Sequence, residues 1–109
     1  MNIIATPLFL RGIKALRKKY PSVRADLDRF YEDLEADPQQ GDPLGKNCYK
    51  VRFAISSKNT GKRNDSRVIT CVKIVADTIH LLDVYEKSER STVSDKELDN
   101  LIKQIDDNE

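Results

Sequence analysis

The sequence has few of the residues that mark a catalytic or metal-binding site by themselves. It contains one histidine, His80, and two cysteines, Cys48 and Cys71, whose spacing does not match that of a metal site. It has no glycine-rich nucleotide-binding loop and no Gly-x-Ser-x-Gly motif, which argues against nucleotide-dependent enzymes and serine hydrolases. We therefore expect a protein that uses neither a metal ion nor a cofactor.

The sequence also lacks long apolar runs, which argues against a protein inserted in a membrane. No run of about 18 apolar residues predicts a membrane span, and the chain does not begin with a signal-like segment. Both cysteines lie in predicted strands without the spacing of metal ligands, and a reducing compartment is the simplest interpretation. With 109 residues, the chain predicts one domain over 1–109 with a single core, in the cytoplasm and away from membranes.

Helical periodicity appears in three segments. Thr6 and Pro7 are typical of a helix start, and the apolar stripe of residues 7–19 ends before Pro21. A second stripe follows over 23–34, with Ser22 as its expected N-cap. The third helix begins at Ser94 and Glu97, which have the spacing of a capping box, and extends to Ile105.

Alternating patterns predict the strands. Residues 2–5 predict a first strand, 37–45 a loop, and 48–56, 67–76 and 79–86 an antiparallel meander with a basic loop over 57–66. The order β-α-α-β-β-β-α predicts an α+β fold, with a twisted antiparallel sheet and helices mainly on one face. The other face of the sheet is then expected to be open.

The net charge of +1 conceals segregated charge. Residues 46–90 hold ten Lys and Arg against five Asp and Glu, whereas residues 91–109 hold two against six. Local potentials of this kind attract charged partners even when the sum is near zero. The simpler alternative is that charged helix faces only keep a small protein in solution, and it stays open.

The strand over 48–56 carries two kinds of chemistry. Side chains alternate across a strand, so Tyr49, Val51 and Phe53 face the core, while Lys50 and Arg52 stand on the other face. If Val68, Thr70, Val72 and Ile74 face the helices, Arg67 joins these two cations. A rigid cationic surface suits phosphate, because arginine binds it with two parallel hydrogen bonds.

These cations also suit RNA cleavage without a metal. That reaction removes the proton of a ribose 2′-OH, neutralises the attacked phosphoryl group and protonates the 5′ oxygen. A lysine crowded by other cations has a lowered pKa and can act as a base, and a tyrosine can stack on a base or pass a proton. From the residues alone, a sheet that only binds phosphate or an acidic peptide is an equal alternative. His80 and the acids of the last helix are better explained as structural and solvated residues.

Several short motifs resemble toxins of the RelE/ParE superfamily, in its RelE/HigB branch. They are Tyr49-Lys50-Val51-Arg52, the basic loop ending in Thr60-Gly61-Lys62-Arg63, Ser66-Arg67-Val68-Ile69 and the segment 81–89. The resemblance covers nearly the whole chain in order and spacing. It implies a RelE-like fold and a type II toxin that enters the ribosomal A site and cleaves mRNA without a metal.

The resemblance also implies roles for individual residues. Lys50 and Arg52 match paired cations of the sheet, one of them a proposed general base, and Arg67 matches an arginine that stabilises the transition state. Tyr85 and Lys87 match a Tyr-x-Lys motif and complete the expected catalytic set. The expected RNA-binding residues are Lys46, Lys58, Lys62, Arg63, Lys73 and Arg90.

The expected partners are a small, DNA-binding antitoxin and the ribosome with its mRNA. The antitoxin is expected to cover the basic face with an acidic or amphipathic segment, or to displace the last helix. Two other functions stay open: a ParE-like inhibitor of DNA gyrase, and a non-catalytic binding module. The latter is suggested by Ser88 and Ser94, which replace an arginine and a tyrosine of relatives.

Overall fold

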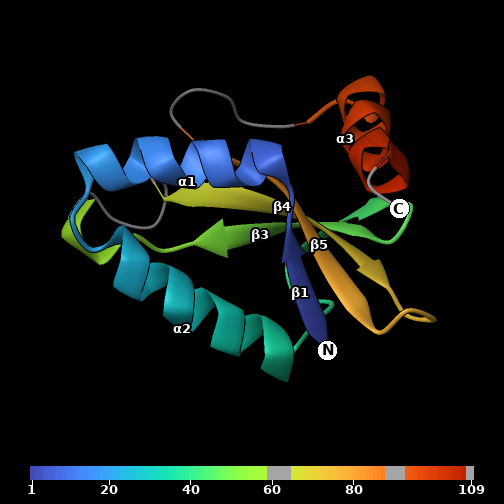
Figure 1. Ribbon diagram of the computed structural model, residues 1–109, viewed down its shortest axis with the longest axis horizontal. Coiled ribbons are helices and arrows are strands. Elements are labelled where there is room, and N and C mark those ends of the chain that lie inside the picture. The colour runs from blue at the N-terminus through green and yellow to red at the C-terminus, as the bar shows by residue number, and fades with distance from the viewer. Residues whose placement is uncertain (59–64, 88–92, 108–109) are drawn as a thin grey trace.

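Five strands form one sheet in the order β1-β5-β4-β3-β2, and three helices pack on it (Figure 1). The computed structural model describes residues 1–58, 65–87 and 93–107. The elements are β1 (Asn2–Ala5), α1 (Pro7–Lys19), α2 (Val23–Ala36), β2 (Asp42–Gly45), β3 (Cys48–Phe53), the 3-10 turn η1 (Ser56–Lys58), β4 (Ser66–Lys73), β5 (Thr78–Glu86) and α3 (Asp95–Asp107). The α+β class and the meander β3-β4-β5 are confirmed.

The sheet is mixed, because β1 runs parallel to β5 while all other pairs are antiparallel. The segment predicted as a loop over 37–45 contains the edge strand β2. Its Pro43 lacks an N–H, which an edge strand tolerates, and Gly41 and Gly45 flank it with φ of 97° and 85°. A four-residue strand with such a composition has the sequence pattern of a loop.

The helices divide between the two faces of the sheet. Phe9 of α1 and Phe30 of α2 belong to one buried cluster with Val51 and Phe53 of β3. Leu101 of α3 belongs to a second cluster on the other face of the sheet. Its strand residues include Cys48, Ile69, Cys71 and Tyr85. The expectation of an open second face is therefore wrong in part, because α3 covers one region of it (Figure 1).

All three helices start after the expected N-cap residues, and two of these residues make a side-chain cap hydrogen bond. Thr6 Oγ1 accepts a hydrogen bond from Phe9 N (3.3 Å), and Ser94 and Glu97 form the capping box, with Glu97 N donating to Ser94 Oγ (3.1 Å). Ser22 makes no side-chain cap; its hydroxyl donates to the Asp26 carboxylate instead (2.6 Å). The Ser22 hydroxyl therefore binds the buried Asp26 carboxylate, one helical turn away, in place of a backbone N–H of the first turn of α2.

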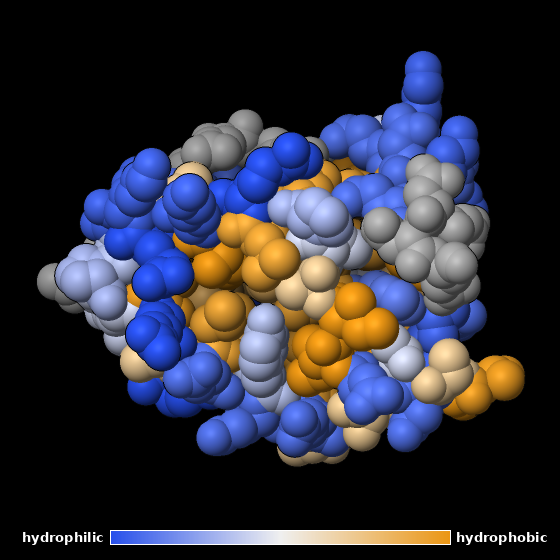
Figure 2. Space-filling view, in the orientation of Figure 1, coloured by the Kyte–Doolittle hydropathy of each residue, from blue (hydrophilic) through white to orange (hydrophobic). Residues whose placement is uncertain are grey.

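Two strands are shorter than the pattern predicts. β3 ends at Phe53, because Ser56 turns toward α2, and β4 ends at Lys73 in a turn closed by Asp77 N donating to Ile74 O (3.1 Å). Ile74, which alternates with Val68 and Val72 in the sequence, lies beyond the end of β4, and 64% of its surface is exposed. Figure 2 shows other hydrophobic residues reaching the surface between α1, α2 and β1. Within the described ranges, no helix is long and apolar enough to cross a membrane.

Helix α1 packs closely on β5 at Gly12. A Cβ placed there would lie 2.5 Å from Val84 Cγ1 and 3.2 Å from Val84 O. Gly12→Ala should lower the free energy of unfolding by about 1–3 kcal/mol, although alanine favours helices. Urea unfolding measures this, with the exposed neighbour Arg11→Ala as control. A Gly12→Ala protein as stable as the parent would contradict this packing.

Candidate functional site

Three polar side chains form one row across the three inner strands, close to the end of β3, the start of β4 and the end of β5. Arg52 on β3 pairs with Arg67 on β4, and Arg67 pairs with Tyr85 on β5. Residues directly opposite each other in adjacent strands project to the same face, so the three share the face that α3 partly covers. We call Arg52, Arg67 and Tyr85 the arginine row. The expectation that Arg67 joins the face of Arg52 is confirmed by this register.

The two arginines of the row are a non-hydrogen-bonded pair. The ladder begins with Cys48 opposite Cys71, and a backbone hydrogen bond from Val72 N to Asn47 O (2.9 Å) joins the residues just outside this pair. The pair of Cys48 and Cys71 is therefore non-hydrogen-bonded. Pair types alternate along an antiparallel ladder, and Arg52 and Arg67 lie four residues further along without a register shift. Their Cα atoms are therefore about 4.5 Å apart, and their side chains start from the closest cross-strand position.

Like charges placed directly opposite destabilise a sheet, by roughly 0.2–1 kcal/mol. Here an acid compensates: Arg52 Nε donates to the carboxylate of Asp65, which is buried. Arg67 Nη1 donates to two backbone carbonyls, Asp65 O (3.3 Å) and Ser66 O (3.1 Å). Each guanidinium keeps further N–H donors, and 47% of the Arg52 side chain is exposed, so the pair can receive an anion.

The other expected catalytic residues lie near this row. Lys50 is half-buried, on the same face as Arg52 and two residues closer to Cys48 along β3. Lys87 is half-buried in the turn that follows β5, two residues beyond Tyr85. Tyr85 is only 5% exposed and belongs to the α3 cluster, so a base can stack on its ring only if its neighbours move.

The structure describes the side chains of two of the six expected RNA-binding residues, Lys46 and Lys73. Lys73 lies six residues from Arg67 along β4, about 20 Å at the rise of a strand. Lys46 forms an ion pair with Asp99 of α3. The backbone of Lys58 belongs to η1, and its side chain is not described. The remaining three, Lys62, Arg63 and Arg90, lie outside the described residues.

The end of β5 is attached to the end of α1 by a buried carboxylate. Glu86 accepts hydrogen bonds from Lys19 Nζ (2.6 Å) and from the Tyr20 hydroxyl (3.2 Å). Glu86 is 6% exposed and follows Tyr85 directly in β5. The contact therefore holds the strand end from which Tyr85 and Lys87 project.

A second buried carboxylate holds the exit of β3. Asp26 of α2 accepts from the Ser22 hydroxyl and from both the backbone N–H (3.0 Å) and hydroxyl (2.9 Å) of Ser56, and it pairs with Arg29. Burial by itself raises the pKa of Asp26, but the hydrogen bonds of the two serines and the charge of Arg29 outweigh it and hold the pKa below its ordinary value of 3.8.

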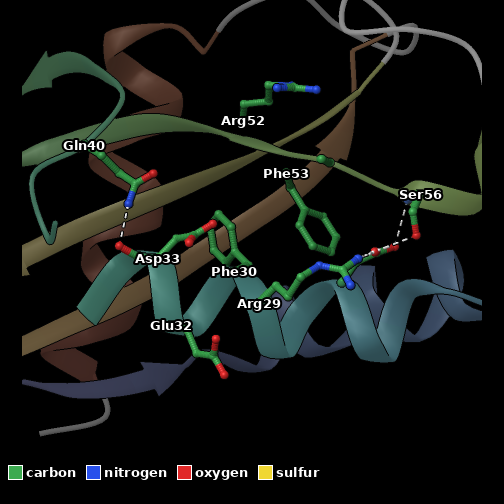
Figure 3. Close-up of a pocket in the computed structure, with 10 residues that line it drawn as sticks. Arg29, Phe30, Glu32, Asp33, Gln40, Arg52, Phe53 and Ser56 are labelled. Atoms are coloured by element: carbon green, nitrogen blue, oxygen red, sulfur yellow. Dashed lines mark hydrogen bonds and ion pairs between the residues drawn. The ribbon is translucent and has the colours of Figure 1, made fainter. Parts of the chain in front are cut away.

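These contacts line a cleft of about 410 Å³ between α2 and the end of β3. Figure 3 shows Phe30 and Phe53 between the helix and the strand, with Arg52 on the far side of the strand. Gln40 closes one end, donating to Asp33 O (2.8 Å). The cleft thus lies at the edge of the sheet beside Arg52.

Three residues of this site were not predicted from the sequence: Asp26, Asp65 and Glu86. The sequence does distinguish Asp65, because it is the one acid in the basic stretch over 57–67 and could pair with a neighbouring cation. It does not distinguish Asp26 and Glu86, since an acid on a helix or at a strand end is ordinarily exposed. Among the described residues, no group of three or more His, Cys, Asp or Glu side chains is arranged to hold a metal ion.

Comparison with solved structures identifies the fold. A free-state structure of a mutant of the E. coli toxin RelE superposes with a TM-score of 0.59, covering 95% of this chain and 96% of that chain. The fold is RelE-like. Because the two sequences are only 16% identical, the structural likeness establishes the fold alone. No family model and no curated protein matches the sequence.

Asp26 predicts how stability depends on pH. Its pKa is lower in the folded than in the unfolded chain, so its contribution is complete above its ordinary pKa and is lost as the pH falls through the folded value. At neutral pH, Asp26→Asn should therefore lower the free energy of unfolding by about 2 kcal/mol. The difference from the parent should shrink below about pH 4.

Urea unfolding at pH 7, 5 and 3 measures this effect. Asp28→Asn, on the exposed side of the same helix, is the control and should match the parent at pH 7. A difference between Asp26→Asn and the parent that is the same at all three pH values would contradict the role assigned to the Asp26 carboxylate.

Proposed function

We propose that this RelE-like protein is the toxin of a type II toxin–antitoxin system and cleaves mRNA on the ribosome in the cytoplasm. The observation that carries the proposal is the arginine row, in which two arginines are placed in opposite positions despite their repulsion. A cost in stability that an anion would relieve is typical of a binding site. The RelE-like fold adds to this support, because the mutant structure that it matches is that of a toxin.

The proposed reaction needs no metal ion. A ribose 2′-OH attacks the adjacent phosphorus, the P–O5′ bond breaks, and a 2′,3′-cyclic phosphate forms. Arg52 and Arg67 neutralise the charge that develops on the phosphoryl oxygens, for which their remaining N–H donors are suited. Lys50 is the candidate to receive the proton of the 2′-OH. Tyr85 and Lys87 are the candidates to protonate the leaving 5′ oxygen.

The proposed partners follow from the same face. An antitoxin that covers the arginine row with an acidic segment would block the phosphate position directly. One that displaces α3 would act on the cluster that contains Tyr85. Both routes leave the α1–α2 side of the sheet unchanged, so the fold would persist in the complex.

Removing Arg67 should separate activity from stability. Arg67→Ala should reduce mRNA cleavage by about 100-fold or more, since it removes donors from the developing charge. Its free energy of unfolding should stay within about 1 kcal/mol of the parent, because the repulsion with Arg52 disappears with the lost hydrogen bonds. Mapping of transcript 5′ ends after induction, together with urea unfolding of purified protein, measures both.

The matched control is Arg24→Ala, which removes an exposed charge from α2 and should cleave like the parent. Transcripts cut equally by Arg67→Ala and the parent would contradict the proposal. So would growth arrest by the parent with intact transcripts and DNA damage signalling, the outcome expected of a gyrase inhibitor.

A further inference from the structure

Two cysteines that are 23 positions apart in the sequence face each other in the sheet. Cys48 on β3 and Cys71 on β4 are direct partners in the ladder, and each is 1% exposed. Both thiols point to the same carbonyl, with Lys46 O lying 3.5 Å from Cys48 Sγ and 3.9 Å from Cys71 Sγ. The two sulfur atoms are therefore gathered at one point beneath the turn that joins β2 to β3.

The geometry of this pair is that of a potential disulfide. The backbone bond from Val72 N to Asn47 O (2.9 Å) makes Cys48 and Cys71 a non-hydrogen-bonded pair, in which Cα atoms are about 4.5 Å apart. Disulfides span Cα distances of about 4.4–6.8 Å, so the bond can form without a shift of either strand. Both cysteines are reduced in the structure.

Helix α3 covers the pair. Cys48 and Cys71 belong to the same buried cluster as Leu98, Leu101 and Ile105 of α3. The ion pair of Lys46 with Asp99 adds a second contact between α3 and the turn above the thiols. Both thiols are therefore buried in a cluster to which α3 contributes, and we expect movement of α3 away from the sheet to increase the access of water and small oxidants to the sulfur atoms.

We propose that Cys48 and Cys71 are a redox modification site that a peroxide converts to an intramolecular disulfide, at a rate set by the docking of α3. One thiolate attacks a peroxide oxygen, so that an S–O bond forms, the O–O bond breaks and the hydroxide released is protonated to water. The second sulfur then attacks the sulfenic acid, the S–S bond forms and another water leaves. Two thiols lose two electrons, and hydrogen peroxide becomes two waters.

The electrostatics of the pair agree with control by α3. Hydrogen bonding to Cys71 and burial raise the pKa of the Cys48 thiol. Because the thiolate is the reactive form, the covered pair is slow to oxidise. Movement of α3 would reduce the burial that contributes to the raised pKa of Cys48, and it would give the oxidant access.

The test treats the full chain with hydrogen peroxide and follows intact mass and free thiols over time. The parent should slowly lose both free thiols and two mass units, and it should remain a monomer. Cys48→Ser and Cys71→Ser should each gain oxygen atoms instead. Leu101→Ala, which loosens α3, should oxidise at least about tenfold faster than the parent. The exposed neighbour Asn100→Ala should oxidise at the parent's rate.

A milder variant keeps the test valid if Leu101→Ala does not fold. Ile105→Val removes one methylene from the same cluster and should accelerate oxidation about threefold or more. Gain of oxygen by the parent without disulfide, or disulfide only between molecules, would overturn the modification site. Equal rates for the parent and the folded α3 variant would overturn control by α3.

Discussion

Two guanidinium groups face each other across β3 and β4, and the rest of the candidate site is arranged around this repulsion. The register pairs Arg52 with Arg67 at a non-hydrogen-bonded position, where cross-strand side chains are closest. Asp65 neutralises one of the two, and backbone carbonyls bind the other. The repulsion is only partly compensated, since guanidinium N–H donors remain on the exposed side of the arginine row. A bound phosphate would neutralise the remaining positive charge. The repulsion between the two arginines is therefore connected with the proposed chemistry.

The surrounding contacts keep this row in place. Glu86 attaches the end of β5 to α1, and Asp26 attaches the exit of β3 to α2. Glu86 ends β5 and Asp26 lies in α2; both are buried acids, and both bind groups from a segment that is distant in the sequence. Rigid attachment matters because positioned charges stabilise a transition state without having to reorganise. Helix α3 differs from these supports, since it covers part of the working face itself and also shields the cysteine pair.

Local patterns were sufficient for much of the fold. The cap at Thr6, the stripe of α1 and the capping box at Ser94 depend on residues three or four apart, and their helices form where expected. Parity in β3 correctly separated Phe53 from Arg52. Prediction failed where a residue distant in the sequence decides the outcome, since β2 forms because β3 lies beside it. Ser22 is the N-cap residue of α2 as predicted, but its hydroxyl donates to Asp26 and makes no side-chain cap. The roles of the expected catalytic and RNA-binding residues stay predictions.

The amino-acid sequence alone determined which residues alternate across each strand, because pleating is a property of the single chain. It therefore determined that Lys50 and Arg52 share a face. Only the tertiary structure decided that Arg67 and Tyr85 extend that row, that Lys73 lies far from it, and that Cys48 meets Cys71. These relations depend on register between strands and on the docking of α3. Both are set by the packing of the whole sheet, which no local pattern encodes.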